Sequence, residues 1–197
     1  MEYIHVDKER VMKDEMDVVK KFLLEGKVIA YPTDTVYGLG CRADSAEAVR
    51  RVYRIKRRKS YKPLIILASS MAMAKKYVMI SRRQEEYLSR YWPGPVTVIF
   101  ESKGRLPKEV EGGTGSLAFR VPDNDFLIKL INSIRSPLVS TSLNISGQEP
   151  VRDPGLVKQY FGKICPDLIV DAGMLKRRKA SKLIDLRDID SVKIVRK

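Results

Sequence analysis

Apolar residues recur along this chain at helical spacing in some stretches and as short continuous runs in others. Between residues 14 and 24 the apolar positions follow helical spacing, and Gly26 ends the run. Residues 45–56 show the same spacing, with Ser45 placed to cap the first turn and Glu47 suited to the positive end of the helix. The pattern predicts further helices at residues 70–77, 81–91 and 125–134.

Short apolar runs between these stretches predict buried strands. They cover residues 28–31, 64–67, 96–100, 117–121, 138–140, 168–170, 183–186 and 192–195. Helices and strands mix without strict alternation. We therefore expect an α/β fold, in which an open, twisted, mixed β-sheet is flanked by helices within a single domain of residues 1–197.

The composition agrees with one globular core. The chain has 197 residues, 44% of them hydrophobic and 31% charged, and it lacks an uninterrupted apolar run of the length, about 18 residues, that would suggest a membrane span. Its first residues lack the apolar core of a signal peptide, so we expect a cytoplasmic protein. Cys41 and Cys165 have no metal-ligand spacing and are expected to be thiols, and a single histidine, His5, excludes a site with several histidine ligands.

The charge is strongly positive. Lys and Arg number 38 against 24 acidic residues, a formal net charge of +14. Such a surface attracts polyanions, with nucleic acid as the first candidate, whereas a surface that serves solubility usually balances the two signs more closely. Charge by itself does not separate a polynucleotide from ATP.

Residues 31–40, YPTDTVYGLG, follow a predicted strand and expose the hydroxyls of Thr33 and Thr35 and the carboxylate of Asp34. These groups, followed by a glycine-punctuated turn, could hold a small polar substrate. The alternative is a turn in which Thr33 and Asp34 cap backbone donors.

Residues 56–62, KRRKSYK, place five cations in seven positions, and no acidic residue lies between Glu47 and Glu85. Only a tertiary contact or a ligand could neutralise this run. One interpretation is an anion site, where Arg58 grips oxygens bidentately and Lys56 supplies a compact charge. The other is cationic charge that suits the C-terminus of a helix.

Three later segments also carry candidate chemistry. Trp92, within RYWPGPVT, is expected to form a packing corner. Strand alternation places Ser116 and Arg120 on one face, where a buried guanidinium would need an anionic partner, either a substrate carboxylate or a structural acid. Residues 140–147, STSLNISG, offer four hydroxyls and one amide, which could bind phosphate and ribose oxygens or satisfy their own backbone. The chain has no Gly-x-x-x-x-Gly-Lys-Ser/Thr loop, so a nucleotide site would not be of the P-loop kind.

These segments, in this order, resemble the YrdC family, whose best-known members are threonylcarbamoyl-AMP synthases. The matching motifs are PTDTVYG at 32–38, K-x-R at 56–58 with KPL at 62–64, WPGPVT at 92–97, RVP at 120–122 and STS-x-N-x-SG at 140–147. The resemblance covers roughly residues 18–150 and is weaker in the tail.

The resemblance implies an activity and a site. L-Threonine and bicarbonate (or CO₂) would give a carbamate that attacks the α-phosphorus of ATP, and the adenylate would pass to partner proteins that modify tRNA. Phosphoryl chemistry of this kind needs positive charge and positioning more than a histidine base. Mg²⁺ would bridge the phosphates without a protein cage. The residues carried over by motif are Lys56, Arg58 and Lys62 for phosphates, Ser142 and Asn144 for the nucleotide, and Thr35, Ser116, Arg120 and Ser140 for threonine.

The chain departs from the family pattern at several positions. Leu143 stands where alanine is usual and could alter its loop, and Leu67 stands near a position where some members have a histidine. Residues 181–185, SKLID, are similar to a Ser-Thr-Val-Val-Asp segment of longer members, which makes Ser181 a candidate for threonine and Arg196 one for ATP.

Two other functions compete with the enzyme. The first is a non-catalytic YrdC-like paralogue that binds double-stranded RNA or tRNA, which the net charge favours. The second is the carbamoyl-transfer domain of hydrogenase maturation proteins, whose additional acylphosphatase unit and zinc-finger cysteines do not fit this length and cysteine count.

Overall fold

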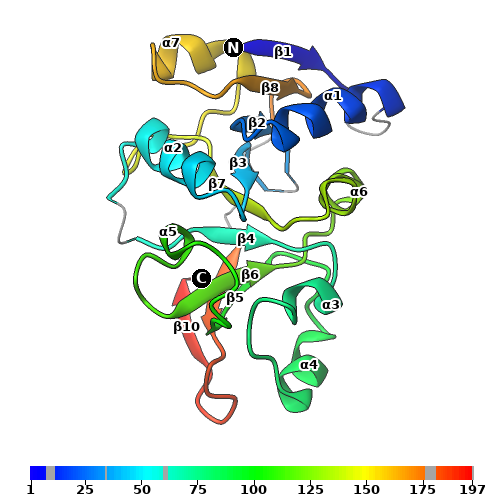
Figure 1. Ribbon diagram of the computed structural model, residues 1–197, viewed down its shortest axis with the longest axis vertical. Helices are drawn as coiled ribbons and strands as arrows, with labels where there is room; N and C mark the ends of the chain where they lie inside the picture. The colour runs from blue at the N-terminus through cyan, green and yellow to red at the C-terminus, as the bar shows by residue number, and fades with distance from the viewer. Residues whose placement is uncertain (8–11, 34, 60–61, 176–180, 197) are drawn as a thin grey trace.

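The computed structural model describes residues 1–7, 12–33, 35–59, 62–175 and 181–196. In this part of the chain the strands form one sheet in the order β1-β8-β2-β3-β7-β4-β6-β5-β9-β10, which runs along the length of the molecule (Figure 1). The strands are β1 Glu2–His5, β2 Ile29–Tyr31, β3 Gly38–Arg42, β4 Ile65–Leu67, β5 Val96–Glu101, β6 Ser116–Arg120, β7 Leu138–Ser142, β8 Leu168–Asp171, β9 Lys182–Asp185 and β10 Lys193–Arg196.

The predicted mixed sheet is confirmed. The pairs β1–β8, β8–β2, β4–β6 and β5–β9 are parallel, and the other neighbouring pairs are antiparallel. Helices cover both faces. They are α1 Lys13–Leu24, α2 Ala46–Lys56, α3 Met71–Ala74, α4 Arg82–Leu88, α5 Lys108–Glu111, α6 Asp125–Ile134, the 3-10 turn η1 Pro154–Leu156, and α7 Val157–Phe161.

Two hydrophobic clusters fill the two sides of the sheet. On one side α1 and α6 pack together, with Phe22 and Leu127 in the same cluster. On the other side α2, α5 and α7 contribute residues such as Val52 and Val110. Figure 1 shows α2 and α6 on opposite sides of β3 and β7. Helices therefore cover both faces of the sheet at these strands.

Local signals in the sequence placed most elements within a few residues. Ser45 caps α2 as predicted, since its hydroxyl oxygen accepts a hydrogen bond from the Ala48 N–H at 3.3 Å. The helices predicted at 70–77 and 81–91 are shorter than expected, and β1, α5 and α7 were not predicted. In the described part of the chain no helix has the length and apolar character needed to cross a membrane. Cys41 is buried and Cys165 partly exposed, and both are free thiols.

The glycine-punctuated turn predicted after Tyr37 is wrong. Residues Gly38–Arg42 form strand β3, which pairs with β2 and β7. A Cβ atom on Gly40 would lie 2.0 Å from the carbonyl oxygen of Val139, and one on Gly38 would lie 2.9 Å from the ring of Tyr31. Within a strand, glycine is also favoured where a neighbouring group approaches the backbone too closely for a side chain. Gly38 and Gly40 are such positions.

Candidate active site

A cavity of about 170 Å³ lies on the α6 side of the sheet, next to β3, β7, β4 and β6. Seven residues predicted for the site line it: Thr35, Arg58, Arg120, Ser140, Ser142, Ser181 and Arg196. Segments far apart in the sequence therefore meet here. Ser140 and Ser142 reach it together because side chains two positions apart on a strand share a face.

Arg58 enters the cavity from the loop after α2. Its Nε donates a hydrogen bond to the Lys62 carbonyl at 3.3 Å, and its Nη2 donates to the Pro63 carbonyl at 2.9 Å. Burial lowers the pKa of Arg58, but the group stays cationic because a guanidinium starts from so high a value. The Lys62 side chain is exposed and lies outside the cavity lining.

Lys56, the last residue of α2, is only 1% exposed. Its ammonium donates to the carbonyl oxygens of Ser142 (2.5 Å) and Asn144 (3.0 Å) and to Asn144 Oδ1 (2.7 Å). Burial, together with the charge of Arg58, lowers the pKa of Lys56 to about 7. The positive charge therefore lies directly behind the Ser142 wall of the cavity, and contact with a phosphate would require one of these acceptors to be exchanged.

Asn144 completes this arrangement. Its Oδ1 also accepts the Ser142 hydroxyl at 2.6 Å, and its Nδ2 donates to the Gln148 carbonyl at 2.5 Å. Leu143 between them is fully buried in the core, so its larger side chain packs away from the cavity. The Asn144 side chain thus binds Lys56 and the backbone of its own loop, while Ser142 also lines the cavity.

Arg120 lies at the end of β6, 5% exposed, and its Nε donates to the Gly94 carbonyl at 2.8 Å. Ser116 shares its face of the strand but sits about 13 Å away, four residues along β6. The Ser116 hydroxyl is 2.9 Å from that of Thr114 and does not line the cavity. Arg120 alone of this pair therefore reaches the site.

Ser181 and Arg196 reach the cavity from the far end of the sheet. The Ser181 hydroxyl lies 2.8 Å from that of Thr97, and Nη2 of Arg196 donates to the Ser181 carbonyl at 2.8 Å. The predicted proximity of the C-terminal segment to the site is therefore present in the structure.

The loop before β3 supplies two hydroxyls. Thr33 Oγ1 donates to the Val36 carbonyl at 2.6 Å and accepts from the Thr35 N–H at 3.0 Å, so the backbone-capping interpretation holds for Thr33. Thr35 lines the cavity. Asp34 lies outside the described residues.

Leu127 and Tyr37 line the cavity but were not predicted as site residues, and Leu67 was singled out only as a departure from the family pattern. Leu127 of α6 and Leu67 of β4 form an apolar part of the wall. Tyr37 ties the wall to the segment after β8, because its hydroxyl donates to the Gly173 carbonyl at 2.8 Å and accepts from the Ala172 N–H at 3.0 Å. Burial raises the pKa of Tyr37 to about 12, so it remains a neutral donor. No sequence signal distinguished this tyrosine from a core residue.

Trp92 forms the packing corner that the sequence predicted. It is 8% exposed, meets Phe100 edge-on, and donates its indole N–H to the Val96 carbonyl at 2.7 Å. The turn it stabilises contains Gly94, the acceptor for Arg120. The corner therefore helps to orient a cavity residue without lining the cavity.

Comparisons with known proteins identify the family of this chain. A family model for Sua5, YciO and YrdC, described as Telomere recombination, matches residues 21–197. The threonylcarbamoyl-AMP synthase of Klebsiella pneumoniae is 40% identical over 161 residues, which cover 80% of this chain and 84% of that protein.

Two solved structures have the same fold. Sua5 of Pyrococcus abyssi, crystallised with L-threonine, is 32% identical with a TM-score of 0.87, covering 95% of this chain and 55% of the other. E. coli YciO is 27% identical with a TM-score of 0.87, covering 100% of this chain and 94% of the other. This chain thus spans little more than half of the Pyrococcus protein.

Proposed function

The chain belongs to the Sua5/YciO/YrdC family, and we propose that it is a threonylcarbamoyl-AMP synthase, an ATP-dependent nucleotidyltransferase. The observation that carries the proposal is the cavity itself. It joins a buried guanidinium, several hydroxyls and a second cation in a chain similar to threonylcarbamoyl-AMP synthases over most of its length. A non-catalytic RNA-binding paralogue would not need this arrangement.

We assign the threonine to the end of the cavity formed by β6 and β7. The Arg120 guanidinium suits the substrate carboxylate, because its donors are arranged to bind two oxygens. Ser140, Ser181 and Thr35 offer hydroxyls for the substrate's polar groups, and Leu67 and Leu127 offer apolar contact to its methyl group. The volume is below the roughly 300–1,000 Å³ typical of drug-sized ligands, so it suits the amino acid better than the whole nucleotide.

We assign the ATP phosphates to the side of the cavity that carries Arg58, Arg196 and Ser142. Arg58 can donate directly to phosphate oxygens. Lys56 contributes positive charge from behind the Ser142 wall, and Asn144 fixes that wall through its contacts with both residues. Lys62 stays a prediction as a nearby cation at the loop surface. Ser116, which bonds Thr114, has no part in this assignment.

The proposed reaction requires no histidine. The threonine amine adds to the carbon of CO₂ and releases a proton, or adds to bicarbonate with loss of water, and either route gives a carbamate. A carbamate oxygen then forms a bond to the α-phosphorus of ATP as the bond to the β-phosphate oxygen breaks, and pyrophosphate leaves with that electron pair. Arg58 stabilises the charge on the phosphate oxygens, and Arg120 holds the threonine in place for the attack.

We further propose that Mg²⁺ enters with ATP and neutralises part of its phosphate charge. Mg²⁺ bound to nucleotides needs few protein ligands. Among the described residues no group of three or more His, Cys, Asp or Glu side chains is arranged to hold a metal. The donor set of the cavity, hydroxyls and cations, fits a metal that is held by phosphate oxygens.

The excess positive charge has a separate role in this proposal. Arg54, Arg57 and Lys62 are exposed beside the loop that carries Arg58. We propose that this basic surface contacts tRNA, and that the adenylate passes to partner proteins that modify tRNA in the cytoplasm. Binding of tRNA should weaken steeply as salt rises, since it would depend on phosphate contacts.

The test is direct. The protein is incubated with ATP, L-threonine, bicarbonate and Mg²⁺, and threonylcarbamoyl-adenylate is sought by mass spectrometry alongside pyrophosphate release. Product should require all of the substrates, should be lost in Arg120→Ala, and should persist in Arg82→Ala, a matched change of an arginine side chain that is 92% exposed. Absence of product from the wild-type protein would refute the assignment.

A further inference from the structure

We infer that Tyr53 is a positioning residue for ATP, which acts by orienting the guanidinium of Arg58. The inference rests on the proposed function, in which Arg58 donates to ATP phosphates. Tyr53 lies on the inner face of α2, is 5% exposed, and does not line the cavity. It therefore cannot contact the substrate directly, and any influence must pass through a neighbour.

The first link is in the backbone. α2 ends at Lys56, and Arg57 adopts a left-handed conformation with φ of 48°. This turn brings the Arg58 N–H to 3.0 Å from the Tyr53 carbonyl oxygen. Such a bond, from the residue after the left-handed one back to the helix, is typical of a helix C-cap. It fixes the main chain from which the Arg58 side chain departs.

The second link is through the side chain. The Tyr53 hydroxyl shares its single proton between the carbonyl oxygens of Lys62, the nearer at 2.8 Å, and Glu109 at 3.1 Å. The Lys62 carbonyl is also the acceptor for Arg58 Nε, and the adjacent Pro63 carbonyl accepts from Nη2. Tyr53 thus holds in place the stretch of backbone that sets the plane of the guanidinium.

The Nη1 amino group of Arg58 remains available to a ligand. Among the described residues, Nη1 makes no hydrogen bond or ion pair, while Arg58 itself lines the cavity. A guanidinium held by two carbonyls has little freedom left, so the N–H groups of Nη1 can meet phosphate oxygens at a small entropic cost. Without the Tyr53 hydroxyl, the Lys62 carbonyl would lose one of its anchors, and the guanidinium would sample more orientations.

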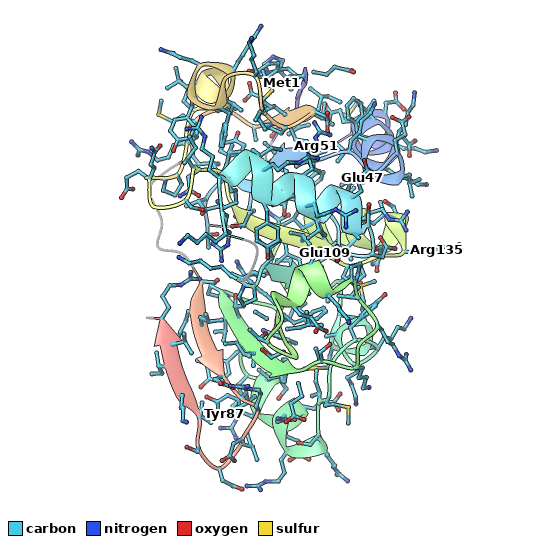
Figure 2. The ribbon with its side chains drawn as sticks, turned by 60° about the vertical axis from the view of Figure 1, so that its left-hand side comes forward. Met1, Glu47, Arg51, Tyr87, Glu109 and Arg135 are labelled. Atoms are coloured by element: carbon cyan, nitrogen blue, oxygen red, sulfur yellow. The ribbon has the colours of Figure 1, made fainter. Side chains whose placement is uncertain are left out.

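The structure also supplies a control. Arg50 and Glu109 form an ion pair of 2.5 Å that joins α2 to α5 without touching the Lys62 carbonyl. Figure 2 shows Glu109 on α5, directly beneath α2. Replacing Arg50 with alanine removes a side-chain contact between these two helices but alters neither the Tyr53 hydroxyl nor its nearer acceptor, the Lys62 carbonyl. A general loosening of α2 against α5 can therefore be separated from a loss of Arg58 orientation.

Calorimetric titration with MgATP and with L-threonine tests the inference on the full chain. Tyr53→Phe, which keeps the ring, should weaken ATP binding about fivefold, as expected for the loss of one hydrogen bond. The KM for ATP should rise in parallel, with kcat and threonine affinity within twofold of wild type. Arg50→Ala should leave ATP affinity within twofold. In an Arg58→Ala background, Tyr53→Phe should have no further effect on ATP affinity.

Three results would overturn the inference: unchanged ATP affinity in Tyr53→Phe, an equal loss of threonine affinity, or the same fivefold effect when Arg58 is already absent. A failure of the proposed function has a different signature, since the wild-type protein would then form no adenylate. If the wild type forms product while Tyr53→Phe binds ATP normally, only the role of Tyr53 is lost.

Discussion

The ammonium of Lys56 lies 2.7 Å from Oδ1 of Asn144, and this contact joins the end of α2 to the loop after β7. Both residues belong to motifs predicted for nucleotide binding, yet in the structure they bind each other. A cation among three oxygen acceptors keeps its charge close to the cavity without exposing it. The contact therefore fixes the position of the Lys56 ammonium beside the phosphate side of the site. The pKa of this ammonium can be tested.

Replacing Lys56 with methionine should change how stability depends on pH. Burial and the nearby charge of Arg58 lower the pKa of Lys56 from 10.5 to about 7. The unfolded chain then binds this proton more tightly than the folded one, so wild-type stability should rise with pH between these values. Relative to Lys56→Met, the wild type should gain about 2 kcal/mol of unfolding free energy between pH 7 and pH 9.

Denaturant unfolding of both proteins at each pH measures this difference. Lys108→Met, a change at an exposed lysine, serves as the control and should track the wild type. If wild type and Lys56→Met change in parallel with pH, the folded protein does not depress the pKa of Lys56.

Arg120→Lys should impair threonine binding although the charge is kept. The guanidinium is buried and is oriented through Nε by the Gly94 carbonyl. An ammonium cannot keep this contact and also bind a carboxylate with two parallel donors. We expect the KM for threonine to rise about 10- to 100-fold and the KM for ATP to change less than threefold, from steady-state pyrophosphate release. An equal rise in both would argue against a carboxylate contact.

Gly40→Ala should destabilise the fold strongly. The new Cβ would meet the Val139 carbonyl at 2.0 Å, and neither β3 nor β7 can move without breaking the sheet. The expected loss is about 3 kcal/mol or more of unfolding free energy. Gly104→Ala is the comparison, since Gly104 has φ of +66° but nothing within 4 Å of an added Cβ. A loss no larger at Gly40 than at Gly104 would contradict the close approach of the two strands.

Arg57→Gly should stabilise the protein. Arg57 ends α2 with φ of 48°, a conformation that glycine adopts without steric cost. We expect a gain of about 1 kcal/mol, measured by denaturant unfolding. Arg135→Gly, at the corresponding position of α6 with φ of 52°, should give a similar gain away from the cavity. A loss of stability in both variants would show that these arginines make compensating contacts.

Local features of the sequence predicted most of the fold. The apolar periodicity and Ser45 cap identified α2, and short apolar runs identified the central strands, because each signal depends on residues only a few positions apart. β3 was missed because Gly38 and Gly40 are usual in turns. Glycine is needed at these positions because the ring of Tyr31 and the carbonyl of Val139, which belong to neighbouring strands, leave no room for a side chain.

The sequence by itself determined which chemical groups the site can use: guanidinium groups, hydroxyls and an amide in a fixed order, with one histidine and no P-loop. Only the tertiary structure decided which of them meet. It places Arg120 in the cavity and Ser116 about 13 Å away on the same strand. It brings Ser181 from beside β9, near the far end of the sheet, and buries Lys56 against Asn144. Residue chemistry is local, but strand order and packing set distances between residues far apart in the chain.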